Sequence, residues 1–242
     1  MSRILDALST HARVRPNATA ISGGGRYWTY AALQADVAAM GRELGGLLVD
    51  TSPDAPIALA FDNAPEWSIL DLALMALGRP VLPLPPFFSS AQIKHALAEA
   101  GACAVIRPAY DGESALFAQQ GAPFLTLAHT GLPSKALPDG TAKITFTSGS
   151  TAAPKGVCLS LTQLEDVAQS IVTVLGAENA GRHFAVLPMG VLLENVAGLY
   201  TAILSGGEHR QEPLATIGFA SAFAPDWIAL AGAIDGARAN SL

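Results

Sequence analysis

Residues 57–84 read IALAFDNAPEWSILDLALMALGRPVLPL. Two short apolar runs flank a longer segment with helical character, and the same alternation continues downstream. The strand-like runs are 57–61, 81–84, 102–106 and 123–127, and the helix-like segments are 65–77 and 89–100. Strands that are apolar throughout and alternate with helices are typical of a mostly parallel sheet covered on both faces. The sequence therefore predicts an α/β fold with mostly parallel sheets flanked by helices.

The flanking segments extend this pattern in both directions. Before it we expect a helix to about residue 13, a hairpin around Gly23–Gly25, and a helix that starts at Thr29 or Tyr30. After it we expect strands at 143–147, 156–159 and 184–187, and helices at 162–175, 192–204 and from 225 onward. Residues 208–212, EHRQE, are predicted to form an exposed edge strand, whose charges discourage pairing with other chains, or to reflect local divergence.

The bulk composition narrows the class of protein. Half of the 242 residues are hydrophobic and 14% are charged, which is enough apolar material for a packed core. The net charge of -6 argues against a nucleic-acid surface. The two cysteines fit neither a disulfide framework nor a metal spacing, and Asp71, Arg79 and several prolines interrupt the most hydrophobic stretch. We expect a cytoplasmic protein without a membrane span.

One loop carries a strong chemical signal. Residues 144–156 read ITFTSGSTAAPKG, with four hydroxyl side chains around one glycine and a lysine–glycine pair at the end. Phosphate oxygens require a high density of hydrogen-bond donors and a backbone that can approach closely, and a lysine adds a point charge. The residues predicted to bind phosphate are Thr147, Ser148, Gly149, Ser150, Thr151, Lys155 and Gly156.

This loop differs from a Walker A loop. That motif needs glycine directly before the lysine and Ser or Thr directly after it, whereas Pro154 and Gly156 stand here. Its flanks also indicate two strands instead of a strand that leads into a helix. The alternative interpretation is a polar surface hairpin, because Ser, Thr, Gly and Pro are common in turns.

The loop at 147–156, TSGSTAAPKG, resembles the signature T-S-G-S-T-G-x-P-K-G of the adenylate-forming superfamily, and differs from it at Ala152. This superfamily includes acyl-CoA synthetases, acyl-AMP ligases, adenylation domains of peptide synthetases, and luciferases. Other stretches resemble its motifs in the same order along the chain. They are 11–20, 29–33 (TYAAL), 63–67 (NAPEW), 83–88, 187–189 (LPM) and 194–198 (ENVAG).

The resemblance implies an ATP-dependent, carboxylate-activating ligase. In that family the loop contacts the β- and γ-phosphates of ATP, and a carboxylate attacks the α-phosphate to give an acyl-adenylate and pyrophosphate. Mg²⁺ shares the charge stabilisation, and the acyl group then passes to CoA or to a carrier protein. The alternatives are a non-catalytic nucleotide-binding module and a fragment of an adenylation domain that loads a carrier protein. A serine hydrolase is disfavoured, because the sequence has no G-x-S-x-G elbow.

The acid-binding site is predicted by position. Gly190 and Val191 stand where the family often has an aromatic residue and a histidine, and Gly190, Glu194 and Asn195 are candidate substrate contacts. Glu194 also fits the first turn of a helix, where an acidic side chain is favourable. The apolar segment 191–204 suits a fatty or aromatic acid, or packing alone. We assign no catalytic residue, and the scattered histidines, without H-x-x-x-H or C-x-x-C, predict no metal site.

The resemblance also predicts the domain organisation. Residues 1–242 correspond to an incomplete N-terminal AMP-binding domain. The adenine-binding stretch and the C-terminal domain with the catalytic lysine would lie outside this chain. We therefore expect the chain alone to be inactive in acyl-adenylate formation.

Overall fold

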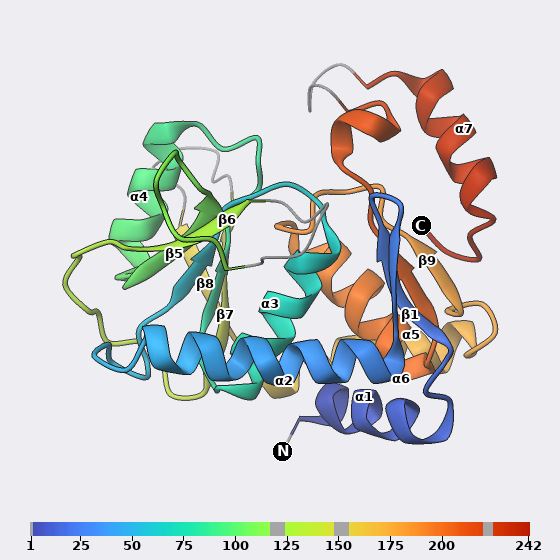
Figure 1. The fold of residues 1–242 in the computed structure, drawn as a ribbon, viewed down its shortest axis with the longest axis horizontal. Coiled ribbons are helices and arrows are strands. Elements are labelled where there is room, and N and C mark those ends of the chain that lie inside the picture. Colours follow the sequence, from blue (N-terminus) through green and yellow to red (C-terminus); the bar gives the residue numbers. More distant parts are fainter. Residues whose placement is uncertain (1, 117–123, 148–154, 220–224) are drawn as a thin grey trace.

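The computed structural model describes residues 2–116, 124–147, 155–219 and 225–242, and has two β-sheets with helices packed around them (Figure 1). The strand pairs in both sheets are mainly parallel. The prediction of an α/β fold with mostly parallel sheets flanked by helices is confirmed. No helix in the described ranges is both long and apolar enough to cross a membrane.

The larger sheet has six strands in the order β6-β5-β3-β4-β7-β8. Their bounds are β3 Ile57–Leu59, β4 Val81–Pro83, β5 Ala104–Pro108, β6 Leu125–His129, β7 Thr141–Thr147 and β8 Lys155–Ser160. The four strands β5, β3, β4 and β7 are parallel, while β6 and β8 pair antiparallel at the two edges. Helices α3 (Pro65–Ala76) and α4 (Ser90–Ala100) connect the parallel strands, as the alternating pattern predicts.

The smaller sheet has four strands in the order β2-β1-β10-β9. Their bounds are β1 Thr19–Gly23, β2 Arg26–Thr29, β9 Arg182–Phe184 and β10 Glu208–Arg210. The hairpin predicted around Gly23–Gly25 is β1–β2. Strand β9 ends three residues earlier than predicted, and Leu187 O instead accepts a hydrogen bond from Asn63, which follows β3 of the larger sheet.

The prediction of an exposed edge strand at 208–212 is wrong. Strand β10 pairs with β1 on one side and with β9 on the other, and His209 and Gln211 are fully buried. The charged residues of β10 alternate with His209 and so face the other side of the sheet. One of them, Glu208, accepts a hydrogen bond there from Ser22 Oγ at 2.6 Å. Strand β10 is therefore a central strand of the smaller sheet despite its mixed polar sequence.

The remaining helices pack against the sheets or against one another, with α1 against α2 and α6, and α7 beside η2 (Figure 1). They are α1 Arg3–Val14, α2 Tyr30–Leu47, α5 Leu161–Leu175, the π-helix η1 Glu194–Tyr200, α6 Thr201–Ser205, the 3₁₀-helix η2 Leu214–Ile217 and α7 Trp227–Ala237. Thr29 caps α2, and Ser89 and Ser160 form capping boxes at α4 and α5. The single helix predicted at 192–204 is thus π-helical in its first part, a form often found at functional sites.

Helix α3 lies at the centre of the molecule. Every residue from Pro65 to Leu74 is buried, including the charged Glu66 and Asp71. A helix that is apolar on nearly all sides is stable only inside a core. Its two buried carboxylates have cationic partners, since Arg26 pairs with Glu66 and Lys143 pairs with Asp71.

Candidate functional site

The predicted phosphate loop connects β7 to β8 in an antiparallel hairpin. Thr147 and Lys155 are directly opposite each other, and the register continues through Phe146 and Gly156. The prediction of two flanking strands is confirmed, which separates this loop from a Walker A loop. Ser148, Gly149, Ser150 and Thr151 lie outside the described residues.

The two described residues that follow the loop differ in their roles. Lys155 is exposed and has no ion-pair partner within the described ranges, so its charge is free to face solvent or an anion. A Cβ atom on Gly156 would lie 3.1 Å from both Ile144 Cγ2 and Phe146 Cζ, which is tighter than an ordinary contact. Gly156 therefore allows close packing of β8 against the side chains of β7.

The loop follows the carboxyl end of β7, and so it lies at the same edge as the segments that follow β3 and β4. Those segments contain Asp62 and Asn63 after β3, and Pro85 after β4. In open α/β sheets, ligands bind beyond the carboxyl ends of the parallel strands. This carboxyl edge is the candidate functional site.

Asn63 holds a second chain segment against the carboxyl edge. Its Nδ2 donates to Leu187 O at 2.9 Å, and its Oδ1 accepts from Met189 N at 2.7 Å. The next residue, Gly190, approaches the segment after β4 so closely that a Cβ atom would lie 2.8 Å from Pro85 N. The structure thus places Gly190, a predicted substrate contact, at the carboxyl edge of the sheet. It also places Asn63 there, as a further residue of the candidate site. The sequence contained Asn63 within the stretch 63–67 (NAPEW) that resembles the family, but gave no indication of its partner.

Asp62 lies beside a cavity at the same edge. Its carboxylate accepts from Asn63 N at 2.7 Å and from Leu214 N at 3.2 Å, and burial raises its pKa above the ordinary value despite these two hydrogen bonds. The cavity measures about 330 Å³, and its lining includes Arg26, Phe61, Phe124 and Leu125. Its walls are mainly apolar with a few polar groups, as in many small-molecule sites.

Glu194 and Asn195 occupy a different environment, in the interior. Glu194 is 3% exposed and contacts His183 and the backbone of Leu187. Asn195 is fully buried, accepts a hydrogen bond from Lys143 Nζ, and donates to Asp71 Oδ2 at 3.3 Å. The structure does not place these two side chains among the residues that line the cavity at the carboxyl edge.

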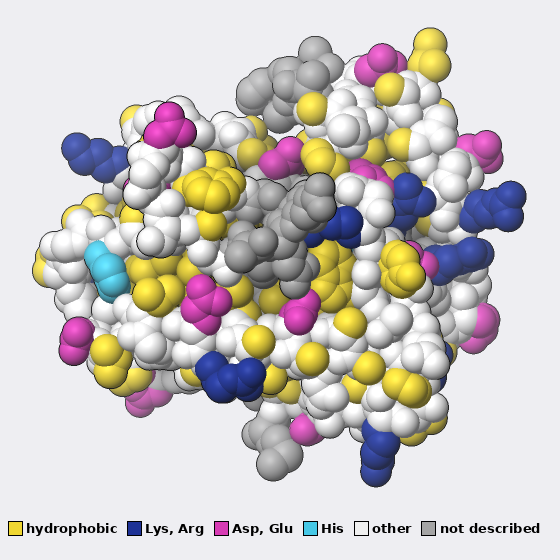
Figure 2. All heavy atoms as spheres, in the orientation of Figure 1, with side chains coloured by type: hydrophobic (Ala, Val, Ile, Leu, Met, Phe, Trp, Pro, Cys, Tyr) yellow, Lys and Arg dark blue, Asp and Glu magenta, His cyan; other side chains and the backbone are white. Residues whose placement is uncertain are grey.

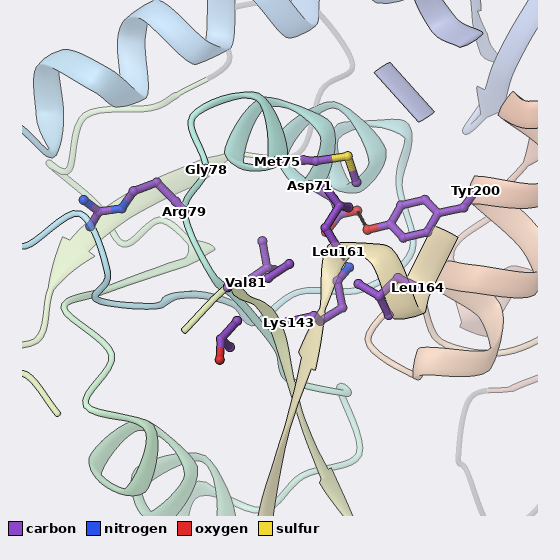
Figure 3. Close-up of a pocket in the computed structure, with 12 residues that line it drawn as sticks. Asp71, Met75, Gly78, Arg79, Val81, Lys143, Leu161, Leu164 and Tyr200 are labelled. Carbon is purple, nitrogen blue, oxygen red and sulfur yellow. Dashed lines mark hydrogen bonds and ion pairs between the residues drawn. The ribbon is translucent and has the colours of Figure 1, made fainter. Parts of the chain in front are cut away.

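A second cavity, of about 180 Å³, opens at the opposite edge of the sheet (Figure 3). Val81 and Thr141, which begin β4 and β7, line it, so it lies at the amino ends of these strands. Asp71, Lys143 and Tyr200 converge on its inner wall from α3, β7 and η1. Because these polar groups satisfy one another, we assign this cluster a structural role.

Several solved structures share this fold. An N-terminal subdomain of NpsA from Klebsiella oxytoca, in complex with 3-hydroxyanthranilyl-AMSN, superposes with a TM-score of 0.73 at 20% identity, over 99% of this chain and 58% of that one. VinN in complex with L-aspartate gives 0.74 at 20% identity, over 98% and 65%. The chain itself matches the AMP-binding enzyme family over residues 8–215, and it belongs to that family.

Curated relatives are much longer proteins. The chain is 28% identical over 196 residues to the nonribosomal peptide synthetase inpA of Emericella nidulans, which covers 76% of the chain and 13% of the relative. It is 30% identical over 194 residues to a probable non-canonical nonribosomal peptide synthetase, CymA, of Salinispora arenicola, covering 79% and 2%. The chain therefore spans only a small part of these relatives.

Proposed function

We propose that this chain contributes the ATP-phosphate-binding loop and part of the acid-binding region of an AMP-forming ligase that activates a carboxylic acid. The observation that carries this proposal is the position of Lys155. It is an exposed, unpaired cation within the described ranges, where β8 leaves a hydroxyl-rich loop at the carboxyl edge of the sheet. ATP would supply the adenylyl group, while Lys155 and the loop hydroxyls would hold its β- and γ-phosphates.

Acid binding is proposed for the same edge. The cavity beside Asp62 and the turn held by Asn63 lie at this edge of the sheet, and the cavity walls are mainly apolar. An apolar pocket with a few polar groups suits an aromatic or aliphatic acid. The predicted contact through Gly190 fits this location, because its missing side chain lets it lie against Leu84 and Pro85, directly after β4.

Two candidate functions differ in the molecule that accepts the acyl group. Transfer to CoA is supported by the fold, since one structural neighbour is an anthranilate CoA ligase with a TM-score of 0.71. Loading of a carrier protein is supported by the curated relatives, which are peptide synthetases. A non-catalytic nucleotide-binding module is the third candidate. Mg²⁺ and CoA remain predictions from the resemblance.

A direct binding experiment tests the nucleotide part of the proposal. Mg-ATP, tripolyphosphate and AMP are titrated separately into the purified 242-residue chain by calorimetry. We expect ATP to bind, and tripolyphosphate to compete with it, because the loop would contact phosphate oxygens. Binding of ATP that tripolyphosphate leaves unchanged would contradict a phosphate-binding role for the loop.

A thermal-shift panel tests which class of carboxylic acid binds to the chain. Fatty, aromatic and amino acids are each added with Mg-ATP, and the thermal midpoint of the chain is recorded. An acid that occupies the cavity raises the midpoint through its binding free energy. Stabilisation by aromatic acids supports an aryl-activating ligase, whereas stabilisation by amino acids alone supports a peptide-synthetase type of substrate.

A further inference from the structure

Two histidines and one glutamate meet in the interior of the smaller sheet. His183 on β9 and His209 on β10 are paired in register on neighbouring parallel strands. Their rings stack with centroids 5.3 Å apart and an angle of 6° between the planes. Glu194, at the start of η1, places Oε1 2.7 Å from His183 Nε2 and 3.5 Å from His209 Nε2.

This cluster is closed to solvent. His183 is 6% exposed, Glu194 is 3% exposed and His209 is fully buried. Within the described ranges, neither ring nitrogen of His209 has a hydrogen-bond partner. A buried polar group without a partner costs roughly 1–3 kcal/mol, so an orphaned imidazole that faces a carboxylate requires an explanation.

We propose that His183, Glu194 and His209 bind a divalent transition-metal ion, and that this ion is zinc. One ligand atom from each residue lies within 4.8 Å of the other two, as a shared ion requires. Two imidazoles and a carboxylate are a ligand set that zinc prefers, and bond lengths near 2.0–2.1 Å place neighbouring ligand atoms about 3.3 Å apart. The 3.5 Å separation is close to this value, and the 2.7 Å separation must open slightly. The two stacked rings must also turn, because an imidazole nitrogen binds a metal ion in the plane of its ring.

Groups around the cluster orient two of the three ligands. Leu187 N donates to Glu194 Oε2 at 3.1 Å, so the second carboxylate oxygen is held while Oε1 faces the imidazoles. Ser241 Oγ lies 3.1 Å from His183 Nδ1 and fixes this ring so that Nε2 points toward Glu194. Hydrogen bonds of this kind to the outer atoms of ligands are typical of metal sites.

Gly198 makes room for the cluster. It lies one turn after Glu194 in η1, and a Cβ atom there would overlap Glu194 Oε1 and lie 2.7 Å from His183 Nε2. The ligand atoms therefore point to the one position of this turn that has no side chain. A three-residue ligand set leaves a fourth position of a tetrahedral zinc ion, and a water molecule would fill it.

The ion would hold together segments that are far apart in the sequence. The ligands come from β9, η1 and β10, and Ser241 adds the C-terminal segment, so one ion would connect four segments of the smaller sheet and its cover. The ligands lie 11 and 15 positions apart, which no short zinc motif resembles, and this explains why the sequence predicted no metal site. This proposal is independent of the proposed nucleotide function.

Zinc stoichiometry and affinity test the proposal. The tag-free chain is treated with a chelator, equilibrated with ZnCl₂ and desalted, and bound zinc is measured by mass spectrometry. Competition with a chromophoric chelator gives the affinity, and Co²⁺ in place of zinc reports the coordination by visible absorption. We expect one zinc ion per chain and a thermal midpoint that rises until one equivalent is bound.

Variants assign the zinc to this cluster. Glu194→Gln keeps the shape and can still hydrogen-bond, but it removes the charged ligand. Ser241→Ala, at a half-exposed position, should fold normally and weaken zinc binding by about 10–100-fold. His129→Gln removes an exposed histidine at the end of β6, and should bind zinc as the unsubstituted chain does. A chain that retains no zinc after desalting, or equal affinity in Glu194→Gln and His129→Gln, would overturn the proposal.

Discussion

Lys143 Nζ lies 2.7 Å from Asp71 Oδ1, and both side chains are almost completely buried. Tyr200 donates its hydroxyl to Asp71 Oδ2 at 2.7 Å, and Asn195 contacts both members of the pair. Burial lowers the pKa of Lys143, while the attraction of Asp71 opposes this shift. The pair therefore joins α3, β7 and η1 through a network that tolerates the loss of neither charge alone.

Lys143→Met should destabilise the chain strongly. It leaves the Asp71 carboxylate buried without a cation, which costs about 3–5 kcal/mol of unfolding free energy. The double variant with Asp71→Leu should recover much of this loss, because no buried charge then remains unpaired. The measurement is urea denaturation of both variants beside the unsubstituted chain.

Lys135→Met is the matched control for this prediction. Lys135 pairs with Glu99 at 3.3 Å, but both side chains are largely exposed, at 44% and 55%. The control should change the unfolding free energy by about 1 kcal/mol or less. Equal effects of the buried and the exposed substitution would show that Lys143 is not held by a buried network.

The sequence predicted those helices and strands whose limits are set by residues close together in the chain. Capping residues before helices, such as Ser89 and Thr29, and apolar runs bounded by turn residues give strand and helix positions without knowledge of the fold. The phosphate loop was predicted for the same reason, since its residues are contiguous. Four of its hydroxyl and glycine positions lie outside the described residues, and their roles stay predictions.

Long-range partners were beyond the reach of local signals. The polar β10 was predicted as an edge strand because charged side chains usually avoid the centre of a sheet. Its pairing with β1 joins residues nearly two hundred positions apart, as in Ile21 opposite His209. Asp71 interrupted an apolar stretch in the sequence, but only the fold shows that Lys143 neutralises it.

Gly190→Ala should destabilise the chain and disturb the turn at the carboxyl edge. The added Cβ would lie 2.8 Å from Pro85 N and 3.0 Å from Leu84 C, and these backbone atoms cannot move aside as a flexible side chain can. We expect a loss of about 1–3 kcal/mol, as for other overpacked sites, measured by urea denaturation.

Gly41→Ala supplies the opposite control for Gly190→Ala. Gly41 lies in α2 with no atom within 4 Å of its hypothetical Cβ, so alanine should stabilise the helix by about 0.5–1 kcal/mol. If both glycine substitutions stabilise the chain, the close approach of Gly190 to Leu84 and Pro85 does not exclude a side chain at position 190.

Asp62→Asn should change how stability depends on pH. Burial raises the pKa of Asp62 from its ordinary value of 3.8, so between the two pKa values the folded state binds more protons than the unfolded state. Stability from this group is complete below pH 3.8 and is lost as pH rises through the folded pKa. The asparagine, which can still accept hydrogen bonds through Oδ1, removes this loss.

Urea denaturation of both proteins across acidic and neutral pH tests the Asp62 prediction. The difference in unfolding free energy isolates one titrating group, because the other groups contribute alike to both curves. The unsubstituted chain should lose stability relative to Asp62→Asn as the pH rises. A relative gain on raising the pH would show that its hydrogen bonds outweigh burial at Asp62.

Lys155→Ala should weaken the binding of ATP while leaving the fold intact. The loss of one charge-assisted contact to a phosphate costs roughly 1.5–3 kcal/mol, or about 10–150-fold in the dissociation constant. Lys155 is exposed and lacks an ion-pair partner in the described part of the chain, so its removal should leave the thermal midpoint nearly unchanged. Calorimetry with Mg-ATP and a thermal melt of the same sample measure both quantities.

Two comparisons separate a phosphate contact from a general charge effect. Lys94→Ala removes the same charge from an exposed position on α4, and should leave ATP affinity unchanged apart from weak long-range attraction. AMP lacks the β- and γ-phosphates, so its affinity should differ little between Lys155→Ala and the unsubstituted chain. If Lys155→Ala weakens AMP and ATP equally, the lysine acts on the shared part of the nucleotide. If Lys94→Ala matches its effect, only net charge matters, and Lys155 has no specific place in the loop.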